Sequence, residues 1–277
     1  MPRRNFTFHE MLEGCREGDP SACLQLVQSY LPLLEFWVDH YFPWLSPGRD
    51  QLIRELLGTT LVKPGGLLTT FQGTWEREFL FEWRRLTLEG CYARALLGNP
   101  PATSPLQRDE LARLLKNSPL LHQELIWFHL CHIPAEEVVH ILSMRSEVAE
   151  PILAKALPSD VGMKWASQSD ERIPLMPPQL LIEIDSERGD DCVSVKLWSK
   201  IIDGQALWSE KEKADGHTTN CLCCLSTLTA LKETIFKLRT LPGADPLQVQ
   251  KIVATAWDRP AVKKSSGITL ARLFKRA

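Results

Sequence analysis

Cysteine and histidine residues cluster near the C-terminus, and this cluster limits how the chain can fold. The stretch reads His217-Thr218-Thr219-Asn220-Cys221-Leu222-Cys223-Cys224, and Cys192 precedes it. If the stretch is helical, positions separated by four and seven residues share one face. His217, Cys221 and Cys224 would then point the same way, and Cys192 on the preceding helix could complete a tetrahedral zinc site.

The remaining cysteine of the stretch has a different expected position. Cys223 would point about 120° away from His217 on the same helix, which makes it a poor ligand. A plainer interpretation is that all these cysteines are buried and behave as small hydrophobic residues. A closed set of four protein ligands leaves no open position for a substrate, so we expect a structural Zn²⁺ site rather than a catalytic one.

Apolar residues recur with helical spacing along most of the chain, which predicts an all-α fold. Leu180–Ile184 is the best candidate for a strand. A proline-rich stretch, Gly98–Pro105, indicates a linker between two helical domains. The expected divisions are a helical domain at 1–98, a helix-turn-helix domain at 106–158, a linker at 159–190, a zinc-binding helical domain at 191–257 and a basic tail at 258–277.

The charge of the chain gives no overall basic signature. The formal net charge is −2, and residues 1–160 carry 15 Lys and Arg against 20 Asp and Glu, which leaves 17 and 14 for the remainder. Nucleic-acid binding draws its affinity from clustered basic charge, so any such surface would have to be local. No apolar run is long enough to cross a membrane, and the eight cysteines favour thiols or metal ligands, so we expect a cytoplasmic protein without membrane contact.

The cysteine-rich stretch resembles the zinc-binding anti-sigma factor domain of bacteria. That family carries the motif His-x-x-x-Cys-x-x-Cys with a Cys or His on the previous helix, which corresponds to His217, Cys221, Cys224 and Cys192 here. The segment Ile201–Leu207 is similar to the turn between the first two helices of the family. The resemblance implies a small helical domain that docks on a sigma factor.

The first 160 residues resemble a sigma factor of the extracytoplasmic-function type. Glu13–Ala22 looks like the opening helix and turn of that family, and Leu26–Pro32 fits its next helix. Phe71–Arg85 is similar to the end of the domain that opens the −10 promoter element, and residues 108–157 match the domain that reads the −35 element. Asp50–Leu56 corresponds to the acidic helix that docks on RNA polymerase. The implied polymerase-binding residues are Asp50, Leu52, Ile53 and Glu55.

Basic residues in the sigma-like regions are the candidates for nucleic-acid binding. They are Arg77, Arg84, Arg85, Arg94, Arg145 and Lys155. The alternative for these arginines is an ordinary solvated helix face. The aromatic residues Trp75, Phe79, Phe81 and Trp83 could likewise stack on flipped bases or form the core.

The expected recognition helix, 146–155, departs from the usual pattern of base-reading helices. It offers Glu147 and Glu150 where Arg, Lys, Asn or Gln normally reach base edges. Pro151 should kink or break the helix, because proline removes a backbone hydrogen bond. These features favour an adaptor that retains the sigma fold without reading promoters.

These patterns predict a regulatory protein and not an enzyme, since no catalytic constellation is visible. The first hypothesis is a sigma-like transcription initiation regulator that engages core RNA polymerase and/or promoter DNA. Its own zinc domain would fold over the sigma-like helices within the same chain, aided by the tether. The alternatives are the adaptor and a zinc-thiol redox sensor, in which Cys223 would be a spare thiol for exchange.

Overall fold

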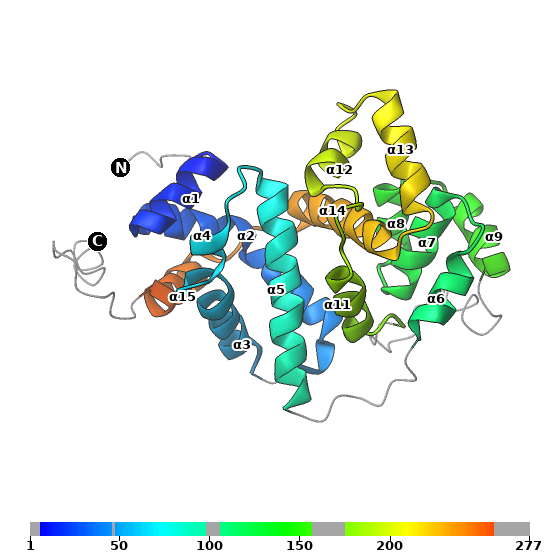
Figure 1. Ribbon diagram of the computed structural model, residues 1–277. Coiled ribbons are helices and arrows are strands. Elements are labelled where there is room, and N and C mark those ends of the chain that lie inside the picture. Colours follow the sequence, from blue (N-terminus) through cyan, green and yellow to red (C-terminus); the bar gives the residue numbers. More distant parts are fainter. Residues whose placement is uncertain (1–5, 46–47, 98–105, 157–174, 258–277) are drawn as a thin grey trace.

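The computed structural model describes residues 6–45, 48–97, 106–156 and 175–257, and every regular element in these ranges is helical. This confirms the predicted all-α class. Figure 1 shows one group of helices from the N-terminal part, a second group from the middle of the chain, and helix α14 (Leu222–Thr240) between them. Among the described residues, no helix has both the length and the apolarity needed to cross a bilayer.

The N-terminal group begins with a tightly capped helical hairpin. Thr7 and Glu10 form a capping box at the start of the first helix, and Gly18 ends that helix with a φ of 79°, which glycine adopts without strain. Asp19 then caps the next helix through the backbone N–H of Ser21. The elements of this group are α1 (Phe8–Glu17), α2 (Pro20–Tyr41), the 3₁₀ turn η1 (Pro43–Leu45), α3 (Arg49–Leu56), the π-helical turn η2 (Leu57–Val62), α4 (Leu67–Thr70) and α5 (Glu76–Leu96).

Aromatic side chains fill the space between α2 and α5. Trp37 and Trp83 pack edge to face with ring centroids 6.3 Å apart, and Phe79 packs on Trp83 in the same manner. Phe79, Phe81 and Trp83 are all buried. In this conformation they are core residues and not a platform for stacking bases.

The middle group follows the predicted boundaries to within two residues. It comprises α6 (Arg108–Leu115), α7 (Leu120–Leu130), α8 (Ala135–Ile141) and α9 (Ser146–Ala156). Of the two expected effects of Pro151, a kink or a break, the break does not occur, because α9 continues through Pro151. Both Pro151 and Glu147 are exposed, so water can bind the carbonyl that loses its helical partner.

The predicted linker contains a helix that the sequence analysis missed. Residues 178–186 form α11 (Pro178–Ser186), so the expected strand at Leu180–Ile184 is wrong. Leu180 and Leu181 lie four and three positions before Ile184, and all three side chains are buried, because α11 packs against both α5 and α14. Short apolar runs do not distinguish a strand from a buried helix.

The C-terminal segment does not form a block of its own. Its helices are α12 (Val195–Ile202), α13 (Trp208–Thr218), α14 and α15 (Pro246–Trp257). Helix α14 packs against α2 and α5 on one side and against α7 and α8 on the other, whereas α15 packs against α2, α3 and η2 (Figure 1). The segment expected to be a separate zinc domain is therefore built into both helix groups.

Charged side chains at the core fix the position of α14. Glu233 of α14 accepts a hydrogen bond of 2.9 Å from the Tyr41 hydroxyl and lies 3.5 Å from Nε of Arg84. Arg84 in turn donates to the Tyr41 hydroxyl at 2.9 Å. Burial raises the pKa of Glu233, and the positive charge of Arg84 opposes that shift. The three side chains form one buried polar cluster that connects α2, α5 and α14.

Removing the Glu233 carboxylate is expected to destabilise the protein strongly. Glu233→Ala removes the ion-pair partner of the buried Arg84 guanidinium and leaves only the charge of Asp185 beyond ion-pair distance, which costs about 3–5 kcal/mol of unfolding free energy. Urea denaturation followed by circular dichroism measures this loss.

Glu89→Ala is the matched control, because Glu89 pairs with Arg85 at the surface. Exposed pairs contribute about 0–1 kcal/mol. Similar denaturation midpoints for the two variants would contradict the importance of the buried cluster.

Candidate metal centre

Four side chains from three places in the chain converge at the start of α14. Cys192 lies in the loop before α12, His217 is on the last turn of α13, and Cys221 and Cys224 belong to the N-cap and first turn of α14. Their ligand atoms all lie within 4.8 Å of one another. Three thiols and one imidazole at this separation can hold a metal ion.

The predicted ligands come together, but the expected backbone path is wrong in two places. His217 does not share a helix with the two cysteines, because α13 ends at Thr218 and α14 begins at Leu222. Cys192 precedes α12 and does not lie on a helix.

The break between α13 and α14 has a local physical cause. The Thr219 hydroxyl donates to the carbonyl of Gly216 at 2.9 Å, and the Asn220 side-chain amide donates to the same carbonyl at 3.3 Å. Such bonds from side chain to backbone compete with helical hydrogen bonding. The turn that they stabilise brings His217 and the α14 cysteines to one point.

The distances fit a tetrahedral metal ion. Sγ of Cys192 lies 3.9 Å from Sγ of Cys221, close to the roughly 3.8 Å expected between two thiolates bound to zinc at about 2.3 Å. The backbone N–H of Val193 donates to Sγ of Cys224 at 3.2 Å. Nε2 of His217 is buried and has no hydrogen-bond partner among the described residues. Buried nitrogens are normally satisfied, so a bound metal would account for this atom.

Geometry, and not protonation, separates the four candidate ligands from Cys223, which lies outside the cluster. Burial raises the pKa of Cys192, but hydrogen bonds from the Gly189 backbone and from neighbouring thiols outweigh it, so the net shift is downward. Burial raises the pKa of Cys224, and a bound cation would be needed to hold this buried thiolate. Burial also raises the pKa of Cys223, to about 12, and Cys223 lies outside the ligand cluster. A buried, protonated thiol is a poor nucleophile, which argues against Cys223 as a spare exchange thiol.

Arg188 holds the loop that carries Cys192, and the sequence analysis did not identify it. Its guanidinium donates to the Val193 carbonyl at 2.6 Å and to the Thr227 hydroxyl at 2.8 Å. It also lies over the ring of Phe81, 5.8 Å from the centroid. Arg188 therefore ties the metal loop to α14 and α5, and no motif marks it in the sequence.

Two of the predicted nucleic-acid-binding residues face the C-terminal helices. Arg77 donates to Asp203 at 2.7 Å and to the Ser199 carbonyl at 3.1 Å. Arg84 is buried against Glu233. Arg84 cannot contact a nucleic acid in this conformation, and the guanidinium of Arg77 is already engaged by Asp203.

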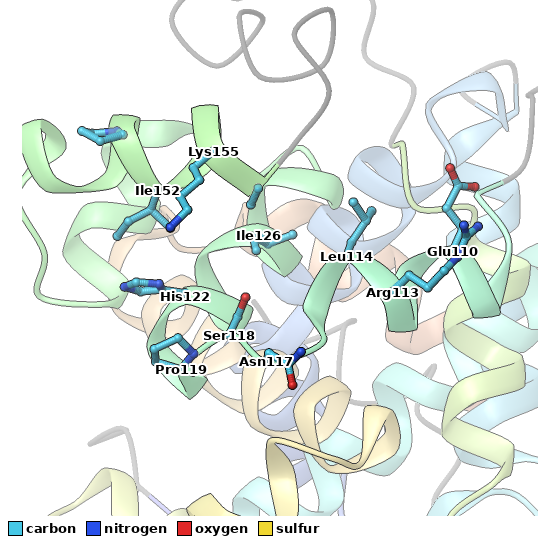
Figure 2. A pocket seen from close by; sticks show the side chains of 12 residues that line it. Glu110, Arg113, Leu114, Asn117, Ser118, Pro119, His122, Ile126, Ile152 and Lys155 are labelled. Atoms are coloured by element: carbon cyan, nitrogen blue, oxygen red, sulfur yellow. The ribbon is translucent and has the colours of Figure 1, made fainter.

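The remaining predicted basic residues lie at the surface. Arg85 pairs with Glu82 and Glu89 along α5, while Arg94 and Arg145 are exposed. Lys155 lies beside Ile152 at a cavity of about 750 Å³ between α6, α7 and α9 (Figure 2). None of the metal ligands lines this cavity.

The predicted polymerase-binding residues divide by burial. Leu52 and Ile53 are buried in the core, where they cannot contact a partner in this conformation. Asp50 and Glu55 are exposed on the other face of α3. Helix α15 packs against α3 and restricts access to it.

Comparison with known proteins gives no relative: no family model, curated protein or solved structure matches this chain. Functional interpretation therefore depends on the residues and geometry of the chain itself.

The metal content of two cysteine variants tests whether Cys224, and not the adjacent Cys223, is a ligand. Cys224→Ser is expected to abolish the single bound metal ion per chain, because it removes one of four ligands. Cys223→Ser is the matched control in the adjacent position and should keep a full equivalent. Inductively coupled plasma mass spectrometry of the purified proteins measures both. Loss of metal from Cys223→Ser with retention by Cys224→Ser would overturn the ligand assignment.

Proposed function

We propose that this chain is a sigma-like transcription regulator whose zinc-binding C-terminal segment closes over its own polymerase- and promoter-binding surfaces. One observation carries the proposal. Two of the arginines that the sigma-factor resemblance assigns to DNA, Arg77 and Arg84, are paired with carboxylates at the end of α12 and on α14. The proposed partners are core RNA polymerase and promoter DNA.

The metal of this segment is Zn²⁺ in the proposal. Three thiolates and one imidazole suit zinc, and four protein ligands in a closed set are typical of structural zinc sites. Such a metal contributes folding free energy directly. Here it would hold α13 and the start of α14 in the arrangement that places α12 on α5.

On the promoter side, two acidic residues of the C-terminal segment form ion pairs with two arginines of α5. Asp203 binds Arg77, and Glu233 binds Arg84. Carboxylates here take the place that DNA phosphates would take in an open conformation. Lys196 also lies 5.3 Å above the ring of Trp75, which further covers the start of α5.

On the polymerase side, α15 is the covering element. It packs on α3 and η2, and Gln248 donates to the Glu35 carboxylate of α2 at 2.8 Å. Asp50 and Glu55 are already exposed in this conformation, so release of α15 would uncover only the other face of α3, where Leu52 and Ile53 are buried.

Ion pairs connect α14 to the middle helix group. Lys232 pairs with Glu124 of α7, and Lys237 pairs with Glu137 of α8. Apolar side chains of both helix groups and of α14 also belong to one core cluster, so separation of the groups would break the ion pairs and expose part of that core. We propose that this separation is the opening step.

The adaptor is the second candidate function, and the surface of α9 favours it. Glu147 and Glu150 are both exposed on the helix that the resemblance assigns to base reading. Carboxylates repel phosphates and suit few base edges. An adaptor would bind polymerase, or another protein, without a promoter footprint.

Charge reversal on α14 tests the closed state within the full chain. Lys232→Glu combined with Lys237→Glu places like charges opposite Glu124 and Glu137, so the double variant should open. We expect it to capture purified core RNA polymerase at least tenfold better than the wild-type chain in a pull-down.

Lys213→Glu is the control, since it reverses one positive charge at an exposed position of α13, outside α14. It should bind polymerase like the wild type. Absence of polymerase binding by the wild type, the double variant and the zinc-stripped chain would refute the proposal. Binding without a promoter footprint would favour the adaptor.

A further inference from the structure

A single buried side chain connects the candidate metal centre to the middle helix group. Gln123 of α7 is 1% exposed. Its Nε2 atom donates to the carbonyls of Leu115 and Ser118 in its own group, at 3.1 Å each. The same atom donates to the carbonyl of Thr219, also at 3.1 Å. Thr219 lies in the turn between two metal ligands.

The orientation of the Gln123 amide follows from its neighbours. All three are carbonyl oxygens, which only accept hydrogen bonds, so the NH₂ group must face them. Two hydrogens serve three acceptors, and Oε1 is buried without a hydrogen-bond partner among the described residues. Buried amide groups are normally satisfied at both ends. The orientation of the Gln123 amide therefore satisfies the three carbonyls and leaves its own Oε1 without a hydrogen bond among the described residues.

The turn that Gln123 contacts determines the spacing of the ligands. The N–H of Asn220 donates to the carbonyl of His217, and the N–H of Cys221 donates to the carbonyl of Thr218, both at 3.1 Å. With these groups occupied, the Thr219 carbonyl points to α7. Any displacement of this carbonyl changes the relative positions of His217 and Cys221.

We propose that Gln123 is a positioning residue that couples metal binding to the docking of the α6–α9 group. A metal-bound turn presents the Thr219 carbonyl where Gln123 can reach it. A docked α7 holds the turn in the ligand geometry, as outer-shell contacts do in metal sites generally. Coupling between two binding events is reciprocal, so metal binding favours docking by the same factor by which docking favours metal binding.

This inference takes one point from the proposed function: docking of the α6–α9 group on α14 is part of the closed conformation. The coupling itself requires no polymerase and no nucleic acid. Its test therefore uses the full-length chain and zinc alone.

Gln123→Met removes the NH₂ donor and keeps a side chain of similar length. We expect its zinc affinity, measured by competition with a chromophoric chelator, to fall roughly tenfold, as for other outer-shell variants.

Asn117→Ala is the matched control. Asn117 lies in the α6–α7 turn whose carbonyls Gln123 contacts, with a φ of 64° that strains alanine, and Gln123 and not Asn117 donates to the Thr219 carbonyl. This variant should weaken the turn and leave zinc affinity within twofold of the wild type. An unchanged affinity in Gln123→Met, or an equal loss in both variants, would overturn the proposal.

Hydrogen exchange measures the reverse direction of the coupling. Removal of zinc from the wild-type chain is expected to speed amide exchange in α7, because the Thr219 contact is lost. In Gln123→Met the α7 exchange should change much less on zinc removal. Equal responses in the two proteins would also refute the coupling. Neither outcome depends on polymerase binding, so this inference and the proposed function can fail separately.

Discussion

A buried carboxylate must have a partner, and this constraint determines where α14 lies. Glu233 meets Arg84 and Tyr41 in the interior, which sets the register of α14 against α2 and α5. With that register, Lys232 and Lys237 face α7 and α8. The start of the helix then carries its cysteines to the turn beside α7. Loss of either charge of the central pair would leave the other unpaired, so this arrangement has few alternatives.

The all-helical class was predictable because apolar periodicity is local. The residues of the metal cluster were also predicted, His217, Cys221 and Cys224 from a helical spacing that the structure does not have, because the turn between α13 and α14 and not a shared helix face brings His217 and the cysteines together. The break at residues 219–221 was not predictable from spacing. It results from competition between the side chains of Thr219 and Asn220 and the helical backbone, which residue periodicity does not report.

Long-range packing accounts for the remaining differences. Charge identified Arg77 and Arg84 as candidates for phosphates, but only the folded chain pairs them with Asp203 and Glu233. Helix α11 was missed because a five-residue apolar run has no period long enough to distinguish helix from strand. Arg188 and Gln123 both donate hydrogen bonds to backbone carbonyls. Many donor side chains of suitable length can make such a contact, so no sequence motif marks these two positions.

The order of the elements along the chain has a consequence for synthesis. The N-terminal helices end with α5 at Leu96, and the last helix that packs on them, α15, ends at Trp257, about 160 residues later. At about 5–20 residues per second, the ribosome needs roughly ten to thirty seconds to add them. Until Glu233 is added, α2 and α5 exist without the α14 carboxylate that pairs with Arg84. Every newly made molecule therefore passes through a form in which α2 and α5 lack helices that pack on them in the folded chain.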